Sequence, residues 1–318
     1  MIDVVALGEL LIDFTMQSVD EEGYPTMTAH PGGAPANFLA ALAKYGRKAA
    51  MIGKVGTDKF GVLLKGTLER AGIETGGLVM ADDVFTTLAF VTLDESGDRE
   101  FSFARKPGAD TCLRYDELTL FLIDGAKAFH FGTLSLTDEP ACGAAKKAVA
   151  YAKQHGKLIT FDPNLRKPLW KNLEDAKRQM IWGLSMADVV KISDEEVEFL
   201  FGMKPDEGAG YILGNFGVKL VFVTCGAEGC FFKNSRASGW TASLPDIEVK
   251  DTTGAGDIFG GSAVCKLLEK EKTPDELDAD DLYDITAFAC TAAGLSTTKA
   301  GGISSVPDYS DVIERING

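Results

Sequence analysis

The chain has 318 residues, of which 45% are hydrophobic and 25% are charged, a balance typical of a globular protein. Its formal net charge of −15 argues against non-specific nucleic-acid binding, which requires lysine and arginine to neutralise phosphates. The length suits one large α/β domain with a smaller attachment.

Several classes of protein are disfavoured by simple features of the sequence. The first segment, MIDVVALGELLIDF, lacks the basic start of a signal peptide, and no stretch approaches the roughly 18–20 apolar residues of a membrane span. The six cysteines form no CxxC pair, so we interpret them as reduced thiols. Three widely spaced histidines argue against a histidine-based triad or zinc site. We therefore expect a cytoplasmic protein that binds neither a membrane nor nucleic acid.

Short runs rich in β-branched residues alternate with longer helical patterns along the chain. The predicted strands are 3–8, 48–56, 127–133, 157–164, 188–193 and 219–226. The clearest predicted helices are 34–46, 58–72, 139–156 and 193–202. Each of these helical patterns ends in glycine, as is common at a helix C-cap. The alternation predicts an α/β fold with a doubly wound, mostly parallel sheet.

Two segments, 12–33 and 86–108, have β-like patterns that no helix interrupts. The sequence ESGD at 95–98 is typical of a hairpin turn. We expect the segments to pair into a small antiparallel sheet, a lid over the ligand-binding ends of the parallel strands. Surface insertions would show the same pattern. The remaining residues, 1–11, 34–85 and 109–318, would form the large domain.

The stretch DTTGAGDIFGG at 251–261 places small residues and an acid at the predicted start of a helix. Unpaired N–H groups at a helix N-terminus suit a phosphate, and Gly254, Ala255 and Gly256 would let a ligand approach the backbone. Asp257 could cap the helix, but capping would leave the small residues before it unexplained. The pattern therefore indicates phosphoryl transfer, with Asp257 taking the proton of an acceptor hydroxyl.

Other polar residues follow predicted strands and suit a polyhydroxylated ligand, whose hydroxyls need both donors and acceptors. Near the N-terminus they are Asp13, Gly32, Gly33 and Asn37. Arg166 follows a central strand and could clamp a phosphoryl group or a sugar oxygen, or could be an ordinary surface arginine. Thr224, Gly226 and Gly229 lie between two predicted strands, where a hairpin and a nucleotide-binding loop fit equally well.

The motifs GGAPAN and DTTGAGD resemble the two signature motifs of the ribokinase-like (PfkB-type) carbohydrate kinases. GELLIDF, KVGTDKFG, DPNLRKPLW, VKISDEEVEFLFG and VTCGAEG also occur in the family's order, so the resemblance spans nearly the whole chain. REFSFARKPGADTCL and DPNLRKPLW look most like the fructokinases of that family. The resemblance implies a ribokinase-like fold and ATP-dependent phosphorylation of the 6-hydroxyl of D-fructose.

The resemblance also implies roles for individual residues. Asp257 would be the general base, with the backbone of Gly254, Ala255 and Gly256 as the anion hole. The sugar would contact Asp13, Gly32, Gly33, Asn37 and Arg105. Arg166 would contact the sugar or the transferring phosphoryl group. The nucleotide site would contain Lys191, Ser193, Glu196, Thr224, Gly226 and Gly229.

Metal ions and partners are implied in the same way. The family uses Mg²⁺ with ATP, and Glu196 matches the acid of its NxxE motif, but Ser193 stands where that motif has asparagine. With serine in place of this asparagine, the family's water-mediated contacts to the metal near the triphosphate do not carry over directly to this chain. A monovalent cation such as K⁺ would lie near Asp251, Thr253, Gly301 and Ser305. The family's lid often forms a dimer interface, which makes a homodimer a further expectation.

Three alternatives stay open at this point. A regulator that binds sugar or nucleotide without catalysis could share the fold, although the presence of Asp257 and Arg166 argues against it. A dinucleotide-dependent dehydrogenase is disfavoured because GxGxxG does not follow the first strand, and GxxxxGK[ST] is missing too. Kinases for ribose or 2-keto-3-deoxygluconate share the scaffold, and Arg105 and Arg166, with Lys106 nearby, could hold the carboxylate of the latter.

Overall fold

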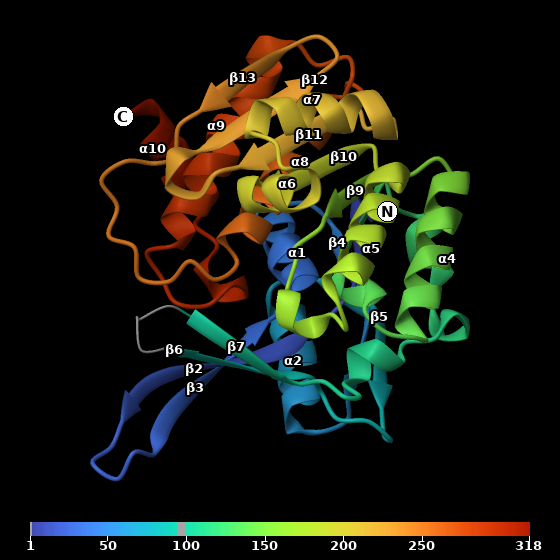
Figure 1. The fold of residues 1–318 in the computed structure, drawn as a ribbon, viewed down its shortest axis with the longest axis vertical. Helices are drawn as coiled ribbons and strands as arrows, with labels where there is room; N and C mark the ends of the chain where they lie inside the picture. Colours follow the sequence, from blue (N-terminus) through green and yellow to red (C-terminus); the bar gives the residue numbers. More distant parts are fainter. Residues whose placement is uncertain (1, 94–98) are drawn as a thin grey trace.

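The structure, a computed structural model, describes residues 2–93 and 99–318. Within them, a nine-stranded sheet with the order β13-β12-β11-β10-β9-β8-β1-β4-β5 forms the centre of the molecule (Figure 1). Its strands are β1 (Val4–Leu7), β4 (Ala49–Gly56), β5 (Glu74–Ala81), β8 (Ala128–Gly132), β9 (Leu158–Asp162), β10 (Val189–Ser193), β11 (Leu220–Thr224), β12 (Cys230–Asn234) and β13 (Ser238–Thr241). The strands from β5 to β11 run parallel, whereas β12 and β13 form an antiparallel edge.

Helices cover both faces of this sheet (Figure 1). They are α1 (Ala34–Lys44), α2 (Lys59–Arg70), α3 (Leu120–Asp124), α4 (Ala141–Gln154), α5 (Leu173–Met186), α6 (Asp194–Phe201), α7 (Pro205–Phe216), α8 (Ala255–Glu269), α9 (Ala279–Ser296) and α10 (Tyr309–Asn317). Successive side chains of β1 alternate between two cores: Val5 and Leu7 pack with α4 and α5, and Val4 and Ala6 with α1 and α8. This two-sided burial explains why the central strands are apolar along their whole length.

The predicted doubly wound α/β fold is confirmed. Every predicted strand of the large sheet coincides with an observed one, and the four clearest helical patterns correspond to α1, α2, α4 and α6. The sequence patterns missed β5, because its sequence ETGGLVMA contains two glycines and only a short apolar run. No helix of the described residues is long and apolar enough to cross a membrane.

The lid is a four-stranded sheet with the order β3-β2-β6-β7, formed by β2 (Leu11–Val19), β3 (Pro25–Gly32), β6 (Leu88–Leu93) and β7 (Arg99–Ala104). Both hairpins are antiparallel as expected, but β2 and β6 pair in parallel, which corrects the prediction for the middle of the sheet. The reason is that β1 and β5 run in the same direction in the large sheet, and each is followed along the chain by one of the two hairpins. The predicted turn at 95–98 lies outside the described residues.

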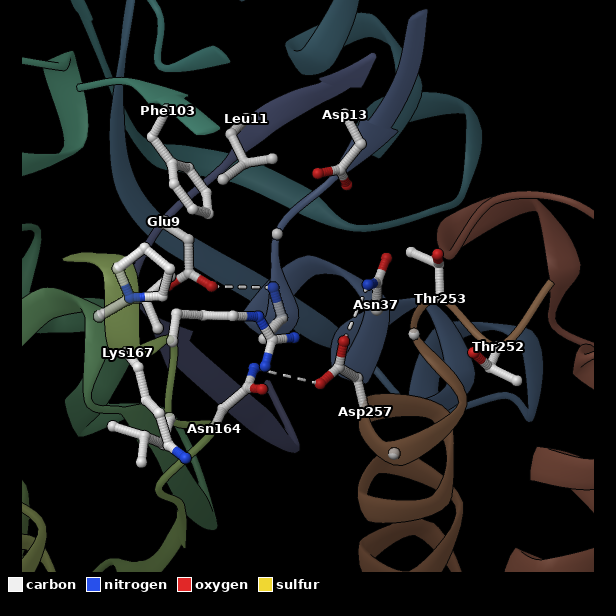
Figure 2. Close-up of a pocket in the computed structure, with 18 of the residues that line it drawn as sticks. Glu9, Leu11, Asp13, Asn37, Phe103, Asn164, Lys167, Thr252, Thr253 and Asp257 are labelled. Carbon is white, nitrogen blue, oxygen red and sulfur yellow. Dashed lines mark hydrogen bonds between the residues drawn. The ribbon is translucent and has the colours of Figure 1, made fainter. Parts of the chain in front are cut away.

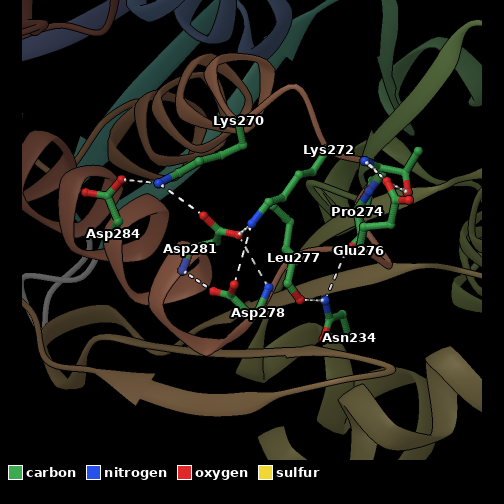
Figure 3. A network of polar contacts seen from close by, with 10 residues as sticks. Asn234, Lys270, Lys272, Pro274, Glu276, Leu277, Asp278, Asp281 and Asp284 are labelled. Carbon is green, nitrogen blue, oxygen red and sulfur yellow. Dashed lines mark hydrogen bonds and ion pairs between the residues drawn. The ribbon is translucent and has the colours of Figure 1, made fainter.

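The acidic stretch at 275–284 organises the start of α9. Figure 3 shows Lys270 and Lys272 pairing with aspartates of this stretch. Beside them, the buried Asn234 side chain donates to the carbonyls of Pro274 and Leu277, both at 2.9 Å. Its Oδ1 accepts from the backbone N–H groups of Arg236 and Ala237. One amide therefore joins the β12–β13 turn to the segment that leads into α9.

Replacing this amide should destabilise the fold. Asn234→Ala leaves two carbonyls and two N–H groups without their partner, so we expect the free energy of unfolding to fall by about 2–4 kcal/mol. Urea denaturation followed by circular dichroism measures it. Asn215→Ala, which removes an exposed amide bonded only to the Tyr211 carbonyl, is the matched control and should cost less than about 0.5 kcal/mol. Equal losses in the two variants would contradict the role given to Asn234.

Candidate active site

A cavity of about 920 Å³ lies where the carboxyl ends of the central strands face the lid (Figure 2). The lid contributes Leu11, Asp13 and Phe103, and the start of α8 contributes Gly254, Gly256 and Asp257. A second cavity of about 460 Å³ adjoins it, because Asn164, Leu165, Arg166, Lys167, Lys191, Glu195, Thr252 and Gly256 line both. The second cavity continues to Ser193, Thr224 and Gly226 at the ends of β10 and β11. The site thus has two compartments that meet at the start of α8.

Asp257 lines the large compartment next to Gly256, which lines both, and it does not cap its own helix. The N-cap of α8 is Gly254, and the carboxylate of Asp257 instead accepts from Asn37 Nδ2 at 2.9 Å and from Asn164 Nδ2 at 3.5 Å (Figure 2). The side chain is buried, and this burial, with the nearby Asp162, raises the pKa of Asp257 to about 6. A carboxylate with a pKa near neutrality is suited to accept a proton from a substrate.

The two glycines before Asp257 are also favoured by packing. Gly254 has φ 77°, and a Cβ there would lie 3.0 Å from Asn37 Nδ2. A Cβ on Gly256 would lie 2.8 Å from Lys191 Nζ. The N–H of Ala255 donates to the Thr252 carbonyl at 3.3 Å, so this member of the predicted anion hole already has a weak partner. The first turn of a helix otherwise offers N–H groups without an acceptor inside the helix.

Lys191 places a positive charge beside this helix start. Its Nζ donates to Asp162 at 3.0 Å, and its side chain lines both compartments. Burial by itself would lower the pKa of Lys191, but Asp162, Glu196 and Asp257 together raise it above its ordinary value. The ammonium group therefore stays charged at neutral pH.

The predicted sugar-binding residues near the N-terminus meet at the large compartment. Burial raises the pKa of Asp13 to about 7, with Asp257 and Asp251 adding to the effect and Arg166 opposing it. Gly32 is required because a Cβ would lie 2.1 Å from Asp13 Oδ2, and Gly33 has φ 115°. The side chain of Asn37 is buried, and its Oδ1 has no hydrogen-bond partner within 2–93 and 99–318. A buried acceptor without a partner is available to a ligand hydroxyl.

The two predicted arginines are placed differently. Arg166 lines both compartments and has no ion pair in the described part of the chain. Arg105 does not line the large cavity: its guanidinium donates to Asp110, with a shortest distance of 2.6 Å, and to Thr137 Oγ1 and the Leu134 carbonyl. Arg105 thus ties strand β7 of the lid to the body of the protein, and its contact with a sugar stays a prediction.

The predicted nucleotide residues divide into two groups. Thr224 and Gly226 line the second cavity, whereas Gly229 lines neither compartment and is required because a Cβ would lie 2.1 Å from the Thr241 carbonyl. Ser193 caps α6, with Oγ accepting from Glu196 N at 3.1 Å. The Glu196 carboxylate accepts from Ser193 N and, at 2.7 Å, from Leu165 N. The bond to Ser193 N completes the capping box of α6, and the bond to Leu165 N holds α6 against the segment that carries Arg166.

The residues of the predicted monovalent-cation site are also partly brought together. The Asp251 carboxylate accepts from Thr253 N and Gly301 N, both at 2.9 Å, and the buried Ser305 hydroxyl donates to the Gly302 carbonyl. Among the described residues, no group of three or more His, Cys, Asp or Glu side chains is arranged to hold a metal ion.

Sequence reasoning missed Glu9, Asp162 and Asn164. Glu9 lines the large cavity and is almost fully buried, and its Oε1 accepts from Ala34 N at 2.9 Å (Figure 2). Burial raises the pKa of Glu9 to about 7. The position of Glu9 directly after Gly8, which ends the first predicted strand, is a sequence signal for a site residue. In the same motif only Asp13 was assigned to the site. Asn164 follows Asp162 in the motif DPN, which sequence reasoning used only to place Arg166.

Comparison with known proteins identifies the family. Residues 1–309 match the model of the pfkB family of carbohydrate kinases. The chain is 40% identical over 320 residues to fructokinase-2 of Solanum lycopersicum, covering 99% of this chain and 96% of that one. It is 40% identical over 319 residues to fructokinase-1 of Zea mays, covering 98% and 97%.

Solved structures agree with this assignment. A fructokinase from Xylella fastidiosa with bound ATP aligns with a TM-score of 0.91 at 30% identity, covering 99% of this chain and 98% of that one. A fructokinase double mutant from Vibrio cholerae, with fructose, ADP and potassium bound, aligns with a TM-score of 0.87 at 28% identity, covering 99% and 98%. The chain belongs to the pfkB family and is an ATP-dependent carbohydrate kinase.

The buried Glu9 carboxyl predicts a dependence of stability on pH. Because the folded protein raises its pKa from 4.5 to about 7, the proton-bound form favours folding, and this contribution is lost as the pH rises through about 7. Relative to Glu9→Gln, the parental free energy of unfolding should fall by about 2 kcal/mol between pH 5 and pH 8. Urea titrations at both pH values measure the difference. Relative to Glu22→Gln, which removes an exposed carboxylate and keeps Glu9, the parental free energy of unfolding should show no such fall; an equal fall relative to both variants would refute the assignment.

Proposed function

We propose that the protein transfers the γ-phosphoryl group of ATP to the 6-hydroxyl of D-fructose. The observation that carries the proposal is the Asp257 carboxylate, which Asn37 holds in the large compartment beside Gly256, a residue that lines both compartments, and whose pKa is raised to about 6. The large compartment would hold the sugar and the second would hold the nucleotide. The choice of fructose is supported by relatives that are named fructokinases and that match this chain over almost their whole length.

In this reaction Asp257 accepts the proton of the 6-hydroxyl while the hydroxyl oxygen forms a bond to the γ-phosphorus. The bond from the γ-phosphorus to the β–γ bridging oxygen breaks, so that fructose 6-phosphate and ADP are formed. General-base catalysis of this kind contributes typically about 10²–10⁴-fold to the rate. A retained proton on Asp257 would block the step, and activity should therefore decline as the pH falls below about 6.

Charge on the transferring phosphoryl group would be stabilised from several directions. Lys191 and Arg166 line both compartments, and the first turn of α8 presents N–H groups with the positive end of its dipole. Mg²⁺ would enter as the Mg·ATP complex and supply further neutralisation. Glu196 would act indirectly, because its carboxylate is occupied by the N–H groups of Ser193 and Leu165.

The sugar would be positioned by acceptors around the large compartment. Asn37 Oδ1 and the Asp13 carboxylate can accept hydrogen bonds from sugar hydroxyls, and Gly33 also lines this compartment. These contacts would orient the 6-hydroxyl toward Asp257.

A monovalent cation and a partner subunit complete the proposal. K⁺ takes oxygen ligands, and the segments around Asp251, Thr253, Gly301 and Ser305 would supply them without any contact to the sugar. The Asp251 carboxylate supports this by joining residue 253 to the Gly301 segment next to α8. Replacing potassium by tetramethylammonium should then lower turnover. A homodimer through the lid is part of the proposal, and the molar mass in solution would test it.

Loss of the base should separate catalysis from binding. Asp257→Asn keeps the shape of the side chain but cannot accept the proton, so we expect kcat to fall about 10²–10⁴-fold while ATP binding is retained. ADP release and calorimetric titration with ATP measure the two effects. Asp280→Asn changes an exposed aspartate of α9 and should leave both unchanged. Parental turnover in Asp257→Asn would show that another group is the base.

A sugar panel tests the substrate. ADP release with Mg·ATP and potassium should depend on D-fructose above ribose, 2-keto-3-deoxygluconate and glucose, and the product should carry its phosphate on O6. A preference for ribose would keep the chemistry and overturn the specificity. Binding of ATP without release in the presence of any sugar would support a non-catalytic regulator instead.

A further inference from the structure

Three buried ionisable side chains gather at one end of the large compartment. Glu9, Arg105 and Asp110 are 3%, 5% and 6% exposed. Arg105 and Asp110 form an ion pair at 2.6 Å, and both lie close enough to Glu9 to influence its titration. Figure 2 shows Glu9 on the side of the cavity near Leu11 and Phe103, away from Asp257. This group therefore faces the end of an acceptor that is remote from the reacting hydroxyl.

Among the residues that the structure describes, no unpaired cation lines the cavity at that end. Asp110 neutralises Arg105, whose remaining bonds go to Thr137 Oγ1 and the Leu134 carbonyl. Arg105 does not line the cavity, whereas Glu9 does. An entering acceptor therefore meets the carboxyl group of Glu9, with the arginine behind it already paired.

The cations of the cavity lie elsewhere. Arg166, Lys167 and Lys191 all line both compartments, so their charges lie at the junction where phosphoryl transfer takes place. Glu9 and Asp13, by contrast, line the large compartment alone. The cavity is thus divided into an acidic acceptor end and a junction that carries the cations.

We infer that Glu9 and Asp110 determine the charge of the acceptor: they favour a neutral polyhydroxylated sugar and exclude one that carries a carboxylate at the end remote from the reacting hydroxyl. The inference rests on the proposed function, because it concerns the acceptor of the same site. A carboxylate placed there would face the charge of Glu9 in a setting where burial weakens screening by water and salt. Asp110 contributes by cancelling the cation that could have compensated for Glu9.

Glu9 also has a structural role that the test must separate. The N-cap of α1 is Gly33, which has no side chain, so Glu9 supplies the missing acceptor to the N–H of Ala34. Loss of that bond alone would lower stability and weaken the binding of every acceptor. It would not change the preference between a neutral acceptor and a charged one.

The test uses two compounds that differ only at C1. 3-Deoxy-D-fructose carries a hydroxymethyl group there, and 2-keto-3-deoxy-D-gluconate carries a carboxylate. Titration calorimetry at pH 8, where Glu9 is largely ionised, gives the dissociation constant of each compound. We expect the parental protein to bind the neutral compound at least about tenfold more tightly.

Two variants remove one negative charge each. Glu9→Gln, and separately Asp110→Asn, should reduce the ratio of the two dissociation constants about tenfold, mainly by tighter binding of the carboxylate. Asp110→Asn can keep its contacts, since its amide oxygen can accept from Arg105 while its NH₂ group donates to Thr87 Oγ1. Glu9→Asp keeps the charge and should keep the parental ratio. Asp116→Asn changes an exposed aspartate six residues after Asp110; it is the matched control and should keep the parental ratio.

Each outcome decides the inference. A parental protein that binds the carboxylate as tightly as the neutral compound, or that binds neither, overturns it. An unchanged ratio of the two dissociation constants in Glu9→Gln or Asp110→Asn also overturns it. Melting temperatures establish that each variant is folded, and if one variant does not fold, the other alone is sufficient for the test. Fructose-dependent ADP release in the parental protein separately tests the proposed function. If fructose is not phosphorylated but the ratios behave as expected, the fructose assignment fails while the acceptor-charge inference holds.

Discussion

The hydrogen bond from Asn37 to Asp257 is the interaction on which the site depends. It joins the first turns of α1 and α8, two helices separated by more than 200 residues in sequence, at the carboxyl ends of the central strands. Each helix begins at a glycine with positive φ: a Cβ on Gly33 would meet the Glu9 carbonyl, and a Cβ on Gly254 would meet the Asn37 side chain of the other helix. The same contact orients the Asp257 carboxylate, and within 2–93 and 99–318 it leaves Asn37 Oδ1 without a hydrogen-bond partner.

Charge is balanced locally rather than over the whole molecule. A chain with a net charge of −15 keeps a buried ammonium group at the centre of its site, because Asp162 pairs with Lys191 and two further carboxylates lie nearby. Removal from water raises the pKa values of Glu9, Asp13 and Asp257 together. The site is thus a cluster of acids that bind protons near neutral pH, held against a few permanent cations, and net charge alone could not have indicated this arrangement.

Much of the fold could be predicted from the sequence, because the apolar strand runs and the glycine-terminated helices are local patterns. The parallel pairing of β2 with β6 could not, since it depends on where β1 and β5 lie in the large sheet. At the site, the motifs indicated Asp257, Asn37 and Gly33, which line one cavity. The pairing of Arg105 with Asp110, and the exposure of Glu9 to the cavity, depend on side-chain contacts between segments that sequence spacing does not specify.

The short connections at the base of the lid have a consequence for how such a protein can diversify. Only residues 8–10 separate β1 from β2, and Gly33 alone separates β3 from α1. An insertion at either point would displace the start of α1, and Asn37 with it. In the six-residue connection from β5 to β6, Thr86 bonds Asp58 at the N-cap of α2, whereas Asp82 and Asp83 are exposed, so changes of length at these two residues would leave the start of α1 in place. Evolution of acceptor preference should therefore proceed through the second hairpin, while the first retains its length.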